Sequence, residues 1–443
     1  MATRLLSPYI PEYRSPALHV ALLVMLAVAL GGGGLAYALN NLIVQLSALL
    51  IIAFHKDRAW QFFREAPLAL RILVVLSVAL PLVQIVPLPA SLWHNMPGRD
   101  LVRQSFELAE IPAYSWFPLS VDTMRSVVAF CGTLAPAAII VIGSTLERDE
   151  LTQLGWALTV AALAAFLLGV VQLATAGNSG LIYDGRADGD VLYATFANRN
   201  SAGMFFVLAV IVQTALPIPR QPIAQMLRLG AFAILAVAVI LTQSRSSMVL
   251  LLVAGAFAGA RLLAMRWPGL KLGWLAGAGT LIAALLAVLA VTQSDGRMRA
   301  SLDRFSDIST DRPAMWEDGL YAAGRYWPAG TGMGTFDEVF QIDESLEHIS
   351  PRRAGRAHND YIELGIEAGI YGLVLLAAWF VWIGWAALQS LPGEWRWMRA
   401  GAAIGLACIA AQSLLDYPLR NQTLLCVAAL LVAILASRQG RPR

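Results

Sequence analysis

Apolar runs of about twenty residues recur along this chain, and turn-rich or charged segments separate them. A hydrocarbon core about 30 Å thick requires about 20 apolar residues in a helix that rises about 1.5 Å per residue. We therefore predict an all-α polytopic membrane protein with about 12 transmembrane helices. The expected spans are residues 16–31, 35–54, 68–87, 124–144, 151–176, 201–217, 229–243, 247–264, 272–292, 361–387, 400–415 and 422–437.

The low charge of the chain supports this interpretation. Of its 443 residues, 58% are hydrophobic and only 14% are charged, whereas about 25% of the residues of a typical soluble domain are charged. Charge this sparse cannot cover the surface of a soluble protein of this length, so part of the solvent is lipid. The net charge of +3 is scattered and forms no basic block, which argues against a nucleic-acid partner.

Basic residues in the short loops predict the orientation, because cytoplasmic loops carry more lysine and arginine than the opposite loops. One set of loops holds seventeen such residues, among them Lys56, Arg148 and Arg399, and the opposite set holds six. We therefore expect both termini of the chain to be cytoplasmic.

The predicted outer side carries three segments that are long enough to fold. The first covers residues about 88–123 and contains aromatic residues suited to the membrane interface. Residues 177–200 form a loop rich in glycine and aspartate, and residues 293–360 form a large loop in which the pattern predicts short amphipathic helices. We accordingly predict a single membrane domain, residues 1–443, with these loops between its spans.

Three arginines are candidates for binding phosphate. The planar guanidinium group binds phosphate oxygens through two parallel hydrogen bonds and keeps its charge where the dielectric constant is low. Arg199 lies where an outer loop enters a helix, Arg245 lies between two apolar runs, and Arg312 begins a predicted helix in the large loop. A cation at membrane depth usually has a specific partner. The alternatives are snorkelling towards lipid headgroups for Arg199 or Arg245, and an ordinary ion pair for Arg312.

His358 is the candidate catalytic base. Asn359 or Asp360 can cap the helix that follows, and Glu363 stands three residues after Asp360, as in a capping box. This cap places His358 beside the positive end of a helix dipole, which disfavours imidazolium and leaves a neutral ring that can accept a proton. Glu363 and Glu367 share one face of an apolar helix, so we expect both to turn inward towards an arginine. The alternative is that His358 has only a structural role at the helix start.

At these residues the chain resembles the bacterial O-antigen ligase and polysaccharide polymerase superfamily. That family has about twelve membrane helices and a large periplasmic loop before a helix that opens with histidine. Its ligase-type signature is histidine, then Asn, Ser or Gln, nine residues, glycine, two residues, and then Gly, Thr or Tyr. His358, Asn359, Gly369 and Gly372 fit this signature. The stretches FANRNSAG and SRSS also look like family segments, and the resemblance spans roughly residues 190–375.

The resemblance implies a glycosyltransferase of the bacterial inner membrane with its active site on the periplasmic face. It would move a glycan from an undecaprenyl diphosphate carrier to an acceptor hydroxyl. An O-antigen ligase of lipopolysaccharide biosynthesis uses lipid A–core as the acceptor, and a polysaccharide polymerase uses a second lipid-linked glycan. Arg245 is followed by Val249 where the ligases often have leucine, and this departure leaves both assignments open.

The resemblance also implies a role for each candidate residue. His358 would be the catalytic general base. The leaving group is a lipid diphosphate, and Arg199, Arg245 and Arg312 would stabilise its negative charge. The supporting residues would be Asn359, Glu363 and Glu367. Direct in-line attack would invert the anomeric centre. Because arginines can replace a divalent ion, and no carboxylate cluster has convincing metal-ligand spacing, we expect no metal and no cofactor.

Two other classes of function are compatible with a membrane bundle. A transporter or flippase of lipid-linked oligosaccharide should carry its ionisable residues near the bilayer midplane. A non-enzymatic assembly protein would tolerate replacement of His358. The candidate residues lie at the predicted outer ends of helices, which favours an enzyme over a transporter.

Overall fold

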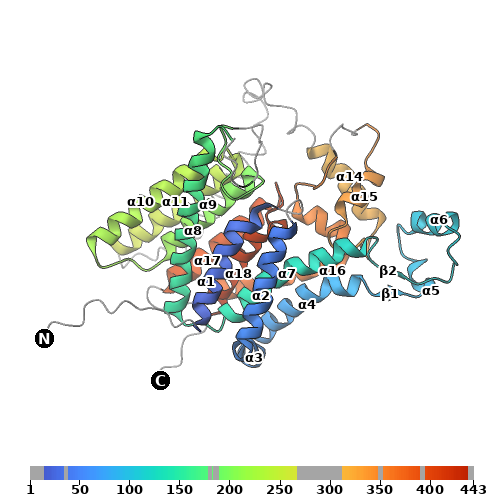
Figure 1. Ribbon diagram of the computed structural model, residues 1–443, viewed down its shortest axis with the longest axis horizontal. Coiled ribbons are helices and arrows are strands. Elements are labelled where there is room, and N and C mark those ends of the chain that lie inside the picture. The colour runs from blue at the N-terminus through green and yellow to red at the C-terminus, as the bar shows by residue number, and fades with distance from the viewer. Residues whose placement is uncertain are drawn as a thin grey trace.

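The computed structural model describes residues 14–33, 38–177, 182, 189–266, 312–347, 353–389 and 395–437, and these residues fold almost entirely into helices (Figure 1). The first half contains α1 (Pro16–Leu30), α2 (Ala38–Phe54), α3 (Lys56–Glu65), α4 (Leu68–Gln84), α5 (Ala90–Trp93), α6 (Asp100–Leu108), α7 (Thr123–Gly143), α8 (Arg148–Ala174) and α9 (Arg199–Ala215). The second half contains α10 (Pro222–Leu241), α11 (Arg245–Arg266), α14 (Arg312–Arg325), α15 (Phe336–Asp343), α16 (Asp360–Leu388), α17 (Trp395–Gln412), the 3₁₀ turn η2 (Pro418–Arg420) and α18 (Gln422–Ala436). A short antiparallel pair joins β1 (Pro87–Leu88) to β2 (Phe117–Pro118).

The predicted all-α class is confirmed among the described residues, and several helices have the length and composition that a membrane span requires. Among the described residues, six helices are long and apolar enough to cross a bilayer, and a seventh span results if the bent pair α2–α3 counts as one. Helices α4, α9 and α18 are apolar but shorter. Eleven of the twelve expected spans fall on a helix. The twelfth, 272–292, lies outside the described residues, so the count of twelve stays a prediction.

Helix α3 was not expected, because residues 56–65 were assigned to a loop between two spans. The helix bends by 79° away from α2. It buries Phe62, while its charged residues are exposed or half-buried, which is the pattern of a helix lying across the end of a bundle. Arg58 of α3 donates a hydrogen bond to the carbonyl oxygen of Thr145 at 3.3 Å, so α3 also contacts the turn between α7 and α8.

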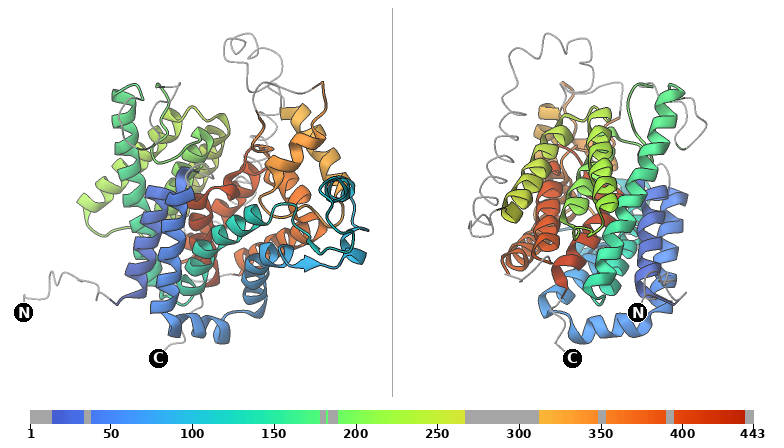
Figure 2. Two further views of the ribbon diagram at one scale, coloured as in Figure 1. Left: turned by 45° about the vertical axis from the view of Figure 1, so that its right-hand side comes forward. Right: turned by 90° about the vertical axis from the view of Figure 1, so that its left-hand side faces the viewer.

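Helix α9 lies in the interior of the bundle. Every residue from Ser201 to Ala215 is buried, and α9 packs against α8, α10, α11 and α17 (Figures 1 and 2). A helix that is apolar on all sides is stable only where neighbours surround it. The burial of α9 fixes the position of its first residues, which follow the cap Asn198.

Helix α16 is interrupted at Gly369, where φ is +53° and ψ is −140°. A side chain here would collide with the carbonyl oxygen of Pro328, so glycine satisfies both the backbone conformation and the close approach. The interruption frees the carbonyl group of Glu367, which accepts a hydrogen bond from the N–H of Gly332 at 2.8 Å. The glycine-rich turn 330–334 therefore docks directly on α16 and fixes the large loop above the first half of that helix.

The elements of the large loop gather at one end of the bundle. Helices α14 and α15 lie at this end, whereas α3 lies at the opposite end (Figure 2). α14 packs on the first half of α16, and Ile362 and Ile366 of α16 contact the buried core that α14 and α15 share. We call the end that carries α14, α15 and the start of α16 the site end.

Candidate active site

His358 lies immediately before α16 and forms a pair with Asp416. The Nδ1 atom of His358 is 3.0 Å from the Oδ1 atom of Asp416, whose side chain is only 3% exposed. The imidazole keeps 26% of its surface accessible, and its edge packs against the ring of Tyr417. A carboxylate beside Nδ1 holds the proton there, so the lone pair is on Nε2. His358 has a φ of +50°, a conformation that is uncommon for any residue with a side chain.

The second oxygen of Asp416 is also engaged. The amide of Asn198, the cap of α9, donates to Oδ2 of Asp416 at 3.4 Å and to the hydroxyl oxygen of Tyr417 at 3.1 Å. Burial raises the pKa of Tyr417 to about 12, with a contribution from the neighbouring Asp416, so its phenol remains protonated at neutral pH. The pair is thus held between the start of α16, the start of α9 and the segment 413–421.

Asn359, rather than Asp360, caps α16. Its Oδ1 atom accepts hydrogen bonds from the N–H groups of Tyr361 and Ile362, and its amide donates to the carbonyl oxygen of Leu414. The predicted capping box does not form. The carboxylate of Glu363 instead accepts the N–H of Ala357 at 2.9 Å and contacts arginines, because an arginine is a stronger partner for a buried carboxylate than the cap N–H.

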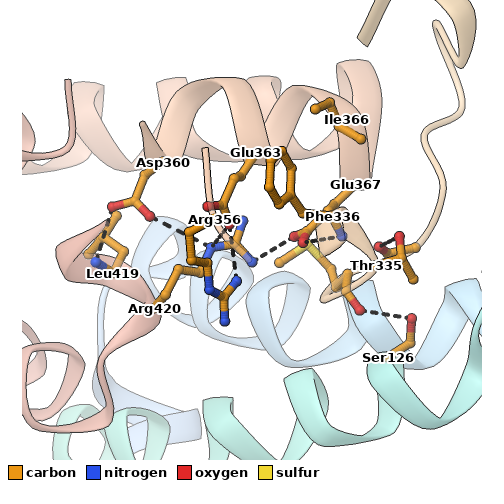
Figure 3. Close-up of polar contacts among 12 residues, drawn as sticks. Ser126, Thr335, Phe336, Arg356, Asp360, Glu363, Ile366, Glu367, Leu419 and Arg420 are labelled. Carbon is orange, nitrogen blue, oxygen red and sulfur yellow. Dashed lines mark hydrogen bonds and ion pairs between the residues drawn. The ribbon is translucent and has the colours of Figure 1, made fainter. Parts of the chain in front are cut away.

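Three carboxylates point from one edge of α16 to a single arginine (Figure 3). Asp360, Glu363 and Glu367 are at most 5% exposed. The guanidinium of Arg420 lies 3.6, 3.4 and 2.6 Å from their respective oxygens. Arg356 adds a second ion pair to Glu363, at 3.1 Å. Glu363 and Glu367 therefore do turn inward towards arginine, and we call these five residues the carboxylate–arginine cluster.

The charges of this cluster fix the protonation of Arg420. Burial alone would lower the pKa of its guanidinium, but the carboxylates of Glu367, Glu363 and Asp360 raise the pKa above its usual value. Its charge is thus already committed to protein carboxylates, which leaves Arg420 unsuited to binding a substrate phosphate.

The cluster holds the segment that presents Asp416 to His358. Oδ2 of Asp360 accepts the hydroxyl of Ser413 at 2.8 Å and the N–H of Leu419 at 3.1 Å. Asp416 lies between these two anchors, and Arg420 follows them. The buried ion pairs of α16 therefore determine the position of Asp416.

The three arginines predicted to bind diphosphate all begin helices at the site end. Arg199 is the first residue of α9 and follows Asn198, while Arg245 is the first residue of α11. Ser244, just before α11, donates to Asn200 of α9 at 2.9 Å, so these two helix starts adjoin.

These arginines differ in what they contact. Arg199 and Arg245 are exposed, and neither guanidinium has a hydrogen bond or ion pair with the residues that the structure describes. Arg312, the first residue of α14, donates to the carbonyl oxygen of Leu415 at 3.0 Å. It thus lies next to Asp416 and forms no ion pair with Asp318 among the described residues, while Asp311, the other candidate partner, lies outside them.

Two important residues of the site were not singled out from the sequence. Asp416 and Arg420 are separated from His358 by about sixty positions and by α17. A signal was present: these are the two charged residues of the short segment 413–421 between two apolar runs, where a buried charge requires a partner.

No group of three or more His, Cys, Asp or Glu side chains within the described ranges is arranged to hold a metal ion. In the carboxylate–arginine cluster, the space that a cation would need is taken by the guanidinium of Arg420 (Figure 3).

Comparison with known proteins relates the middle part of this chain to a family. A search of curated proteins gave no match. Residues 230–377 match the family model described as O-antigen ligase. The matched segment includes Arg245, Arg312 and His358, the kink at Gly369 and the first half of α16. This match confirms, over residues 230–377, the resemblance of this chain to the O-antigen ligase and polysaccharide polymerase superfamily.

Proposed function

We propose that the protein is a glycosyltransferase of the O-antigen ligase type. It transfers a glycan from an undecaprenyl diphosphate carrier to a hydroxyl of lipid A–core at the periplasmic face of the bacterial inner membrane. The His358–Asp416 pair is the observation that carries the proposal, because it leaves Nε2 as a base, and Asp416 also contacts Asn198, the residue before Arg199. The family match supports the enzyme class and a lipid-linked glycan as substrate.

In the proposed reaction, Nε2 of His358 removes the proton of the acceptor hydroxyl. The hydroxyl oxygen attacks the anomeric carbon, the new glycosidic bond forms, and the bond from that carbon to the diphosphate breaks. Asp416 stabilises the imidazolium that results, as the buried carboxylate does in a catalytic triad. Attack from the face opposite the leaving group inverts the anomeric centre.

The departing lipid diphosphate keeps the electron pair of the broken bond. Positive groups that are already in place stabilise the negative charge of this leaving group. Arg199 and Arg245 provide guanidinium groups that have no partner among the described residues, on two adjoining helix starts. Arg312, which donates to Leu415, adds a further guanidinium group from α14, close to Asp416. Asn359, Glu363 and Glu367 have supporting roles, since they cap α16 and anchor the segment that holds Asp416.

Transfer by the purified protein in liposomes tests the proposal. Lipid-linked glycan is offered either with lipid A–core or with a second lipid-linked glycan. We expect glycan to appear on lipid A–core. Extension of the second lipid-linked glycan instead would assign the protein as a polymerase of the same superfamily. Movement of lipid-linked glycan across the bilayer without a new glycosidic bond would make it a transporter and contradict the proposal.

The proposed orientation predicts a labelling pattern. In a variant without Cys131, Cys408 and Cys426, a cysteine at Asp190 should react with an impermeant thiol reagent in intact spheroplasts. A cysteine at Glu147, at the opposite end of α8, should react only after lysis. Both positions are exposed, so accessibility to solvent does not distinguish them. The reverse pattern would place His358 in the cytoplasm and exclude a periplasmic reaction.

Replacement of Arg245 tests the diphosphate contact. Arg245→Lys keeps the charge but loses the planar fork, so we expect most of the transfer activity to be lost while the amount of protein is unchanged. Arg103→Lys is the matched control, because Arg103 is an exposed arginine whose one ion pair among the described residues is with Asp100 on α6. Near-normal activity of both Arg245→Lys and Arg245→Ala would reduce Arg245 to a cation that faces headgroups.

Removal of divalent metal should leave the reaction intact, because guanidinium groups are proposed to neutralise the diphosphate. Transfer is measured before and after saturating EDTA, with the donor and acceptor unchanged. Loss of activity that magnesium or manganese restores would contradict this prediction and point to a carboxylate site, with the acidic loop 177–200 as the first place to search.

A further inference from the structure

An apolar cavity of about 250 Å³ lies between α4, α7, α16, α17 and α18 and is partly open to the outside of the bundle. Tyr361 and Leu419 form its wall at the site end, and Ile140 and Ile383 line its deeper part. Along α18 it extends from Leu425 to Val432, a length of roughly 10 Å at the rise of an α-helix. The cavity is therefore elongated along the helices, as a site for a hydrocarbon chain would be.

The polar groups in the cavity wall are already satisfied by the protein. The hydroxyl of Tyr361 donates to the carbonyl oxygen of Ala410 at 2.7 Å, and the indole N–H of Trp379 donates to the hydroxyl of Ser77 at 3.0 Å. The hydroxyl of Thr133 likewise bonds within its own helix. A water molecule needs two to four polar partners to remain in a buried site, and this wall offers few, so the cavity suits hydrocarbon rather than water.

The local structure of α7 maintains the space. Pro136 lines the cavity from within α7, and a proline there removes one backbone hydrogen bond of the helix. Pro136 has no N–H group to offer the carbonyl oxygen of Gly132, one turn earlier in α7. That oxygen instead accepts a hydrogen bond from the side chain of Gln422 at 3.2 Å. Because the freed carbonyl group of α7 has a partner on α18, the proline that lines the cavity is accommodated in the packed fold.

The cavity ends beside the candidate active site. Tyr361 lies three residues after His358, and Leu419 lies three residues after Asp416. The N–H of Leu419 also donates to Asp360 of the carboxylate–arginine cluster. A lipid whose head group is at His358 therefore has an apolar path into the bundle within about one helical turn.

We infer that this cavity binds the isoprene units of the carrier lipid that lie nearest to the diphosphate. The inference rests on the proposed function, which places the diphosphate at the arginines of the site end. An engineered apolar cavity of about 150 Å³ holds one benzene molecule. By that scale the present cavity accommodates roughly ten carbon atoms, or about two isoprene units.

Photo-crosslinking tests the inference without requiring transfer. The probe is a polyprenyl monophosphate with a diazirine on its second isoprene unit, added to the protein in phospholipid nanodiscs. We expect labelled peptides from α16 and α18. Unlabelled polyprenyl monophosphate should suppress this labelling, and additional phospholipid should not.

A variant that fills the cavity provides the comparison. Ala428→Phe places a ring in the cavity from α18 and should reduce labelling about tenfold, the effect of losing the burial of roughly two methylene groups. Ala377→Phe is the matched control, because Ala377 is exposed on α16 and does not line the cavity. If Ala428→Phe does not fold, Ala428→Leu fills part of the same space and should reduce labelling by a smaller factor.

Equal labelling of the Ala428 variants and the Ala377 control would overturn the inference, and so would equal competition by phospholipid, which would make the occupant an ordinary membrane lipid. The probe carries no sugar, so the two proposals fail separately. Labelling of the cavity without transfer in liposomes contradicts the proposed function, whereas transfer without labelling contradicts the lipid site.

Discussion

His358→Ala is expected to lower the rate of glycan transfer about 10²–10⁴-fold, the usual contribution of a general base. The residue contributes Nε2 as the proton acceptor, and its other nitrogen is occupied by Asp416 at 3.0 Å. Donor lipid should still bind, because Arg199, Arg245 and Arg312 remain. Transfer rates and donor binding are measured on the same purified preparations.

His358→Gln separates catalysis from a structural role at the start of α16. Glutamine can still donate a hydrogen bond to Asp416, but it does not accept a proton near neutral pH. Asp416→Asn provides a second comparison: it keeps the shape of the side chain while removing the charge that favours a proton on Nδ1. We expect a large loss of rate in both variants. A folded His358→Gln protein with substantial transfer would defeat the catalytic assignment and move the search for a base to Glu363 or Asp360.

Arg420→Gln is expected to destabilise the protein by about 3–5 kcal/mol, the cost of breaking a buried ion pair by removing one partner. The substitution leaves Asp360, Glu363 and Glu367 in a buried site, with Arg356 as the one remaining arginine of the cluster. It should lower the midpoint of thermal unfolding in detergent and reduce the amount of folded protein.

Two comparisons make this result specific. Arg103→Gln removes an exposed arginine from an ion pair with Asp100, whose side chains are 44% and 62% exposed, and should change stability by less than about 0.5 kcal/mol. The double variant Arg420→Gln/Glu367→Gln also removes one of the carboxylates that has lost its partner. It should recover about 0.5–3 kcal/mol of the lost stability, because residues of one ion-pair network are energetically coupled by about that amount. If Arg420→Gln were as harmless as Arg103→Gln, the cluster would not be what holds the segment 413–421.

The sequence predicted individual helices well and their junctions less well. The expected span 201–217 coincides with α9, because an apolar run of that length has few alternatives to a helix. Residues 56–65 were assigned to a loop because charge separates two apolar runs there, yet burial of Phe62 makes them helical. The capping box expected at Glu363 was replaced by ion pairs, since local spacing contains no information about distant arginines.

The sequence alone determined the membrane class, the helix that follows His358 and the inward face of Glu363 and Glu367, because each of these depends on local composition or on the helical period. Only the tertiary structure decided that Asp416 is the partner of His358 and that Arg420 is the arginine at the carboxylates of α16. The physical reason is that a buried charge requires a partner but does not specify where in the chain that partner lies. Packing of α16 against α17 and the segment 413–421 makes that choice.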